Sequence, residues 1–82
     1  MNTDKIIREL EKIYGSEKGG KIYMTIMPGI LADFNKMLRR ASTGQKVTEK
    51  YQIEDNKAAI VLNGSRKAKD DFDIDAEVVS NI

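Results

Sequence analysis

Residues 21–41, KIYMTIMPGILADFNKMLRRA, combine more apolar surface with clearer local signals than any other stretch of the chain. Ile22, Met24 and Ile26 alternate with more polar residues, which is typical of a half-buried strand. Pro28 then marks the turn into a helix, because the fixed φ of proline suits the first helical turn. The apolar positions of this helix form one continuous face at helical spacing: Ile30, Leu31, Phe34, Met37, Leu38 and Ala41. We therefore expect a strand and an amphipathic helix on which the neighbouring elements pack.

A shorter helix is predicted before this stretch, between an N-cap at Asn2 or Thr3 and a stop at Gly15. Its apolar residues make a single stripe at the period of an α-helix: Ile6, Ile7, Leu10, Ile13 and Tyr14. Residues 15–20, GSEKGG, are predicted to form a polar loop. The stripe needs a partner surface, because short helices gain most of their stability from packing.

The second half of the chain predicts β-structure. Alternation in residues 47–53 and a short apolar run at 58–62 indicate a β-hairpin over 46–63. A helix near residues 55–63, with Asp55 as its cap and Gly64 as its stop, remains the alternative. Residues 65–71 are expected to be a solvated linker, and strict alternation over 71–78 predicts a C-terminal edge strand or an unfolded tail.

These elements give an α+β fold of 82 residues. Two helices are expected to pack on a 3–4 stranded, mostly antiparallel sheet in the order α-β-α-β-β, with the possible C-terminal edge strand last. A chain of this length hides only about 60–65% of its unfolded surface, which is too little for two cores. Residues 1–69 are therefore expected to form one domain, with 70–82 as an acidic strand or tail.

Composition excludes several kinds of chemistry. The chain has no cysteine and no histidine, which removes disulfides, thiol nucleophiles, the commonest zinc ligands and the usual general base near neutral pH. The run of Asp71, Asp73 and Asp75 begins like a calcium loop, but Ala76 and Ile82 stand where an EF-hand requires glycine and glutamate. We expect no catalytic residues, metal or cofactor, and an enzyme is the third choice of function.

Charge is distributed unevenly along the chain. All 14 basic residues and 8 of the 13 acidic residues lie within positions 1–69, which gives that part a net charge of +6. The other five acids follow position 69 without a base among them. A basic body is therefore followed by an acidic tail, which is expected to fold back over the basic residues or to add as a strand to a partner.

Positive charge is densest over residues 34–69, which contain nine basic and three acidic residues. If the end of the second helix lies near the following strand, these side chains can contact several phosphates, and Tyr51 or Tyr23 can stack on a base. The candidate nucleic-acid-binding residues are Lys36, Arg39, Arg40, Lys46, Lys50, Tyr51, Arg66 and Lys67. The bland alternative is that they are ordinary surface residues, with Arg39 and Arg40 suited to the negative end of a helix dipole.

The run KIYMTI at residues 21–26, followed by Pro28, Leu31, Phe34 and Leu38, resembles the strand and first helix of ribbon-helix-helix DNA-binding proteins. That resemblance implies a paired strand whose Lys21, Tyr23 and Thr25 read bases in the major groove. The likeness covers about a quarter of the chain. The sequence departs from the family where residues 54–56, EDN, stand in place of an apolar dimer core.

We therefore expect a small non-catalytic binding or regulatory protein of the cytoplasm, with nucleic acid as its first candidate partner. The alternative is a protein-binding adaptor or inhibitor of the kind that mobile elements encode, acting by direct contact with a partner protein. A homodimer is also compatible with the alternating C-terminal segment. The first residues lack a signal-peptide core, and no apolar run approaches the roughly 18 residues of a membrane span.

Overall fold

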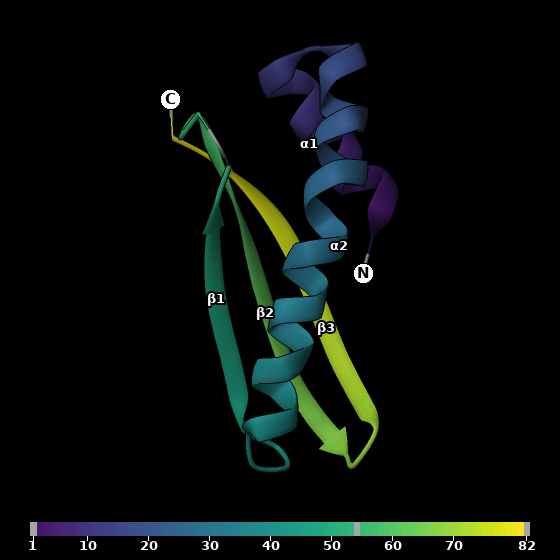
Figure 1. The fold of residues 1–82 in the computed structure, drawn as a ribbon, viewed down its shortest axis with the longest axis vertical. Helices are drawn as coiled ribbons and strands as arrows, with labels where there is room; N and C mark the ends of the chain where they lie inside the picture. Colours follow the sequence, from purple (N-terminus) through teal and green to yellow (C-terminus); the bar gives the residue numbers. More distant parts are fainter. Residues whose placement is uncertain (1, 54, 82) are drawn as a thin grey trace.

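The computed structural model describes residues 2–53 and 55–81 (Figure 1). Within them, two helices are followed by three strands: α1 (Thr3–Tyr14), α2 (Ser16–Arg40), β1 (Lys46–Gln52), β2 (Ala58–Ala68) and β3 (Asp71–Ser80). The helices pack on one face of an antiparallel sheet in the order β1-β2-β3. The predicted α+β class, with two helices on a small antiparallel sheet, is confirmed.

Helix α1 begins and ends where the sequence indicates. The side chain of Asn2 accepts a hydrogen bond from the backbone N–H of Lys5 (3.2 Å) and so caps the first turn. Gly15 ends the helix with a φ of 96°, a left-handed conformation that glycine adopts at little cost. Ile6 and Leu10 are fully buried on the apolar stripe, which packs against α2.

Helix α2 is the main correction to the sequence prediction. It starts at Ser16 and runs without a break to Arg40, so residues 16–20 of the predicted loop and the whole predicted strand at 21–26 are helical, and only Gly15 separates the two helices. The strand expected as the second element of the chain is therefore part of α2, and the described elements follow in the order α-α-β-β-β. The KIYMTI segment is consequently no ribbon strand, and the base-reading role implied by the resemblance to ribbon-helix-helix proteins has no structural basis here.

The burial pattern explains why this segment is helical. An alternating strand would bury Ile22, Met24 and Ile26 together, whereas Ile22 is buried and Met24 is 78% exposed. Ile22 instead extends the stripe of Ile30 and Phe34 at multiples of four residues, so the whole stretch presents one helical face. The missing N–H of Pro28 leaves the carbonyl of Met24 without its helical bond, at an exposed position where water can replace it.

The sheet is a meander of two hairpins. β1 pairs with β2 from Lys46 opposite Ser65 to Gln52 opposite Ala59, and β2 pairs with β3 along nearly its whole length. The hairpin predicted over 46–63 is confirmed, as is the C-terminal strand. β2 extends to Ala68, so most of the predicted linker at 65–71 is strand, and the helix alternative at 55–63 is wrong. Glu54, part of the expected turn, lies outside the described residues.

The core lies between the helices and one face of the sheet, where α2 runs along the strands and α1 contacts β3 (Figure 1). Two glycines allow close approach. A Cβ on Gly64 of β2 would lie 2.8 Å from the ring of Phe34, and one on Gly19 of α2 would lie 2.7 Å from the backbone of Glu11 in α1. These contacts fix how near α2 comes to the sheet and to its helical neighbour.

Candidate functional site

Side chains of each strand alternate between the helix-covered face of the sheet and its opposite face. Val47, Tyr51, Phe72, Ile74 and Val78 pack against the core. Their sequence neighbours point the other way, where no helix of the described chain covers them. We call this surface the open face; it is made by Lys46, Thr48, Lys50, Gln52, Val61, Asn63, Ser65, Asp73, Asp75, Glu77 and Val79, whereas Ala59, which points the same way, is fully buried.

The strand register sorts the charges of the open face into rows. Each row crosses the three strands: Lys46, Ser65 and Asp73; Thr48, Asn63 and Asp75; Lys50, Val61 and Glu77. The lysines stand on β1 and the acids on β3, with uncharged residues of β2 between them. Because neighbouring strands lie about 4.8 Å apart, base and acid backbones in one row are separated by about 9.6 Å. The open face therefore has a basic side and an acidic side.

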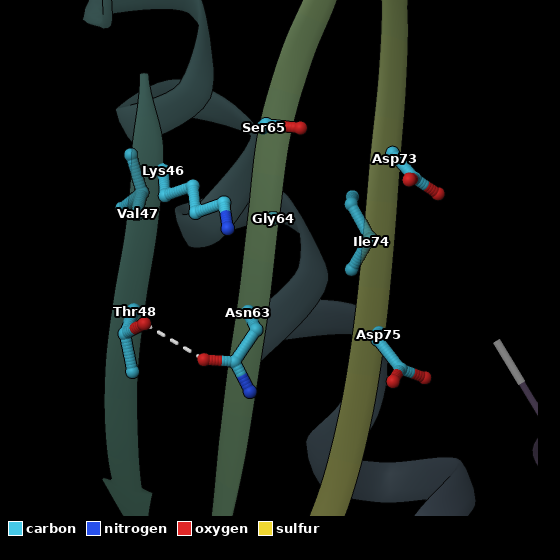
Figure 2. A pocket seen from close by; sticks show the side chains of 9 residues that line it. All are labelled: Lys46, Val47, Thr48, Asn63, Gly64, Ser65, Asp73, Ile74 and Asp75. Atoms are coloured by element: carbon cyan, nitrogen blue, oxygen red, sulfur yellow. Dashed lines mark hydrogen bonds between the residues drawn. The ribbon is translucent and has the colours of Figure 1, made fainter. Parts of the chain in front are cut away.

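A shallow depression of about 540 Å³ lies on this face where the first two rows meet. Figure 2 shows its lining residues. Thr48 Oγ1 donates a hydrogen bond to Asn63 Oδ1 (2.7 Å), which ties β1 to β2 across the floor of the depression. Lys46 extends over β1 toward Gly64, whereas the carboxylates of Asp73 and Asp75 point away from β2 toward the outer side of β3 (Figure 2). The depression thus offers a cation, a polar centre and exposed carboxylates.

The structure does not bring the predicted basic residues into one patch. Lys46 and Lys50 stand on the open face. Lys36 and Arg40 are exposed on α2, which lies on the opposite side of the sheet. The two groups therefore lie on opposite sides of the sheet, and residues 41–45 connect the helix to the strand.

Arg39 and Arg66 contribute to the end of α2. Arg66 Nη1 donates a hydrogen bond to the backbone carbonyl of Arg39 (3.0 Å), one of the last carbonyls that the helix itself leaves unpaired. The guanidinium of Arg39 lies 5.9 Å from the centre of the Phe72 ring, a cation–π contact. Arg66 Nε is buried without a hydrogen-bond partner among the described residues. Arg66 thus helps to fasten α2 to the sheet.

Tyr51 and Lys67 are also engaged. Tyr51 packs against the core and its hydroxyl donates to the carboxylate of Asp33 on α2 (2.8 Å). Burial, followed by this hydrogen bond and the charge of Asp33, raises the pKa of Tyr51 above its ordinary value. Lys67 lies 3.7 Å from the carboxylate of Asp73 in an exposed ion pair. The half-buried ring of Tyr51 thus lies on the helix-covered side of the sheet, away from Lys46 and Lys50.

The acidic segment does not cover the lysines of β1, and among the candidate basic residues it forms an ion pair with Lys67 alone in the described part of the chain. Asp73, Asp75 and Glu77 extend along β3, and β2 separates them from the lysines of β1. Successive acids on one face of a strand are about 6.6 Å apart. They form a line of charge, and the described residues contain no cluster of three acidic side chains able to hold a metal ion.

A second, smaller hollow lies near the turn between β1 and β2. Its volume is about 330 Å³, and it is lined by Tyr14, Lys18, Ile22, Ile26, Ile53 and Asp55. The hydroxyl of Tyr14 donates to Asp55 Oδ1 (2.8 Å). Burial and this contact raise the pKa of Tyr14 to about 12, while the same hydrogen bond lowers the pKa of the Asp55 carboxyl. The contact links α1 to the hairpin turn.

Sequence reasoning missed Thr48, Asn63 and Ser65 of the open face, and it did not place Asp73 and Asp75 beside them. Alternation at 47–53 and 71–78 already indicated which side chains of β1 and β3 share a face. The missing information was the pairing, because a shift of one residue in register exchanges the two faces of a strand.

Comparison of the chain with protein-family models, with curated proteins and with solved structures found no match. No helix in the described part of the chain is both long and apolar enough to cross a membrane.

Proposed function

We propose that this protein is a non-catalytic, protein-binding adaptor or inhibitor whose open face contacts the partner. The observation that carries the proposal is the ordering of the three rows of that face: β1 contributes a lysine to two of them, β2 an uncharged residue to each, and β3 an acid to each. Such a surface selects a partner by complementary charge, which favours the right orientation and disfavours other partners. The alternating C-terminal segment, which the sequence predicts as an edge strand or an unfolded tail, supplies the acidic side of this surface.

The same ordering argues against phosphate as the ligand of the open face. Asp73, Asp75 and Glu77 repel a polyanion, and their charges offset those of Lys46, Lys50 and Lys67, the last of which already pairs with Asp73. The surface also lacks an aromatic side chain on which a base can stack, since Tyr51 faces the core. A protein surface of mixed charge fits these groups better.

Nucleic acid remains a second candidate because of four cations around β1. Lys36 and Arg40 lie on α2, Lys46 and Lys50 lie on β1, and none of the four has an ion-pair partner among the described residues. Residues 41–45 join the helix that carries the first pair to the strand that carries the second. Four cations support contact with about four phosphates, with an affinity that falls steeply as salt rises.

Affinity capture tests the first candidate. The immobilised wild-type chain is compared with Asp75→Lys, which reverses one charge on the open face, and with Lys36→Glu, a charge reversal on the opposite side of the protein. A bound protein identified by mass spectrometry should be retained by the wild type and by Lys36→Glu and lost from Asp75→Lys. Equal retention by all three chains would contradict a role for the open face.

Fluorescence anisotropy with labelled duplex DNA and single-stranded RNA tests the second candidate. If four phosphates are contacted, raising the salt from about 50 to 200 mM should weaken binding roughly 150-fold on duplex DNA and roughly 50-fold on single-stranded RNA, and Lys36→Ala with Arg40→Ala should flatten that dependence. No binding at the lower salt concentration would eliminate this candidate and leave the first untouched.

A further inference from the structure

The sheet ends in two edges of opposite charge. β1 and β3 each pair only with β2 among the described strands, so each presents one row of unpaired backbone groups. Lys46 and Lys50 accompany the edge of β1, and Asp73, Asp75 and Glu77 accompany that of β3. Figure 2 shows the carboxylates of Asp73 and Asp75 leaning toward the outer side of their strand. Each edge therefore displays the charge that the other edge would attract.

Two backbone hydrogen bonds show which residues of β1 and β3 direct their backbone N–H and C=O groups away from β2, toward the free edge of the sheet. The N–H of Ile53 donates to the carbonyl of Ala58, so alternate residues from Ile53 back to Val47 bond to β2. Along an antiparallel strand, residues that bond to the neighbouring strand alternate with residues that do not. The backbone N–H and C=O groups that point to the free edge of β1 are therefore those of Lys46, Thr48, Lys50 and Gln52. Likewise, the N–H of Asn81 donates to the carbonyl of Lys57. The outward groups of β3 consequently belong to Phe72, Ile74, Ala76 and Val78.

Such edges fit one another in a parallel arrangement. In a parallel ladder, an outward residue bonds to the two residues that flank its neighbour on the next strand, and the side-by-side residues share a face. Thr48 meets this condition if it lies beside Asp75 of a second copy. Its backbone N–H and C=O can then bond to the edge-facing backbone groups of Ile74 and Ala76, which flank Asp75. β1 and β3 already run in the same direction within one chain. A sideways shift of the whole molecule therefore brings the two edges into parallel register.

We propose that copies of this chain associate side by side, with β1 of one copy adding in parallel to β3 of the next, so that one sheet continues through both. Without a shift along the strands, the rows of the open face continue across the junction. Lys46 then lies beside Asp73 of the next copy, and Lys50 lies beside Glu77 of the next copy. On the opposite face, half-buried Val47 and Tyr51 adjoin half-buried Ile74 and Val78 of that copy.

Symmetric pairings are less favourable on charge. Two β3 edges joined antiparallel, with their helices on one side, set the acids of one copy directly opposite the acids of the other. Two β1 edges brought together place Lys46 and Lys50 near their own counterparts and provide no acid on that face. Of the three pairings, that of β1 with β3 sets opposite charges beside each other in both rows that contain a lysine and places uncharged Thr48 beside Asp75 in the third.

Because β1 of one copy pairs with β3 of the next, every open assembly keeps a free β1 edge at one end and a free β3 edge at the other. A contact of this head-to-tail type builds rings if the rotation closes and open filaments if it does not. One pair of edge strands buries less than the roughly 1,600 Å² of a standard interface, so we expect weak assembly that requires protein concentrations of about 0.1–1 mM. Salt should reduce it, because the charges at the edges are exposed.

Sedimentation of the purified full chain across this concentration range tests the proposal with two reversed variants. The first, Lys46→Glu with Lys50→Glu, makes both edges acidic; the second, Asp73→Lys with Glu77→Lys, makes both edges basic. The second also removes the exposed pair between Lys67 and Asp73, which is worth little. A control, Lys5→Glu with Arg8→Glu, changes the net charge as the first variant does but lies on the exposed side of α1.

The wild type and the control should exceed the 9.2 kDa monomer mass at least about twofold, while each reversed variant stays monomeric. An equimolar mixture of the two reversed variants should assemble again, because acidic edges then meet basic ones. Far-UV circular dichroism of each variant shows that it is folded. A monomeric wild type at the highest concentration overturns the proposal, as does a mixture that fails to assemble while both variants are folded.

This inference does not depend on the proposed function. Self-association uses the strand edges and is measured with the purified chain alone, whereas capture of a partner uses the open face at concentrations too low for assembly. Failure of either measurement leaves the other result standing.

Discussion

Gly19 lies where α1 and α2 come closest, and its replacement by alanine gives the most direct test of the fold. A Cβ at this position would stand 2.7 Å from both Cα and N of Glu11 and 2.8 Å from its Cγ. Nonbonded carbon atoms normally lie about 3.5–4.0 Å apart, so roughly 1 Å of room is missing. Two of the three atoms are backbone and cannot rotate away. The helices must separate, which disturbs the packing of buried Ile6 and Leu10.

Gly20, the next residue of the same helix, is the matched control because no atom lies within 4 Å of a Cβ built on it. Alanine at either position gains about 0.8–1.0 kcal/mol of helix propensity. Overpacking costs about 1–3 kcal/mol and applies only at Gly19. The two variants should therefore differ by about 1–3 kcal/mol in free energy of unfolding, with Gly20→Ala more stable than the wild type and Gly19→Ala less stable than Gly20→Ala.

Urea and thermal unfolding followed by circular dichroism measure this difference. For a domain of this size, 1 kcal/mol corresponds to about 4–8 °C in Tm, so the two variants should melt at least about 4 °C apart. The propensity gain is common to both substitutions, and their comparison isolates the steric effect. Equal stability of the two variants would refute the close approach of α1 and α2 at Gly19.

Three further predictions concern the sheet and its contacts with the helices. Gly64→Ala should destabilise the fold by about 1–3 kcal/mol in urea unfolding, because its Cβ would lie 2.8 Å from the Phe34 ring and 2.9 Å from a backbone oxygen of β3; wild-type stability would contradict that packing. Tyr51→Phe should lose about 1 kcal/mol in the same measurement, since it removes the hydrogen bond to Asp33, and an unchanged midpoint would show that this bond adds nothing. The hydrogen bond from Tyr14 lowers the pKa of the Asp55 carboxyl in the folded state, so its contribution to stability is present above the ordinary pKa of 3.8 and is lost as the pH falls below it. Unfolding midpoints measured from neutral to acid pH should therefore fall less steeply for Asp55→Asn than for the wild type, and identical profiles would contradict the linkage.

Several features of the fold follow from local sequence. The stripe from Ile6 to Tyr14, bounded by Asn2 and Gly15, determines α1, because period, cap and stop all agree. Strict alternation with charged residues determines the C-terminal strand and its two faces. The apolar surface of residues 30–41 likewise determines a helix that must be covered. Each prediction depends on neighbours along the chain.

The segment 21–26 shows where local sequence was insufficient. Ile22, Met24 and Ile26 satisfy strand alternation, but Ile22 and Ile26 are also four residues apart and fit the stripe of the following helix. Pro28 favoured a boundary because proline removes a helical hydrogen bond. Packing decides otherwise, since Gly19 allows contact with α1 and Ile22 and Met27 join the core only when the segment is helical.

For the open face, too, local sequence determined some features and the tertiary structure determined others. Sequence identified the basic and acidic residues and the faces of β1 and β3, and thus the groups that can bind. Only the tertiary structure assigned Arg66 to the end of α2, Tyr51 to Asp33, and Lys46 and Asp73 to one row of the open face. Periodicity determines which way a side chain points within its own element. The neighbours it meets there depend on strand register and helix packing, which join residues that are far apart in the chain.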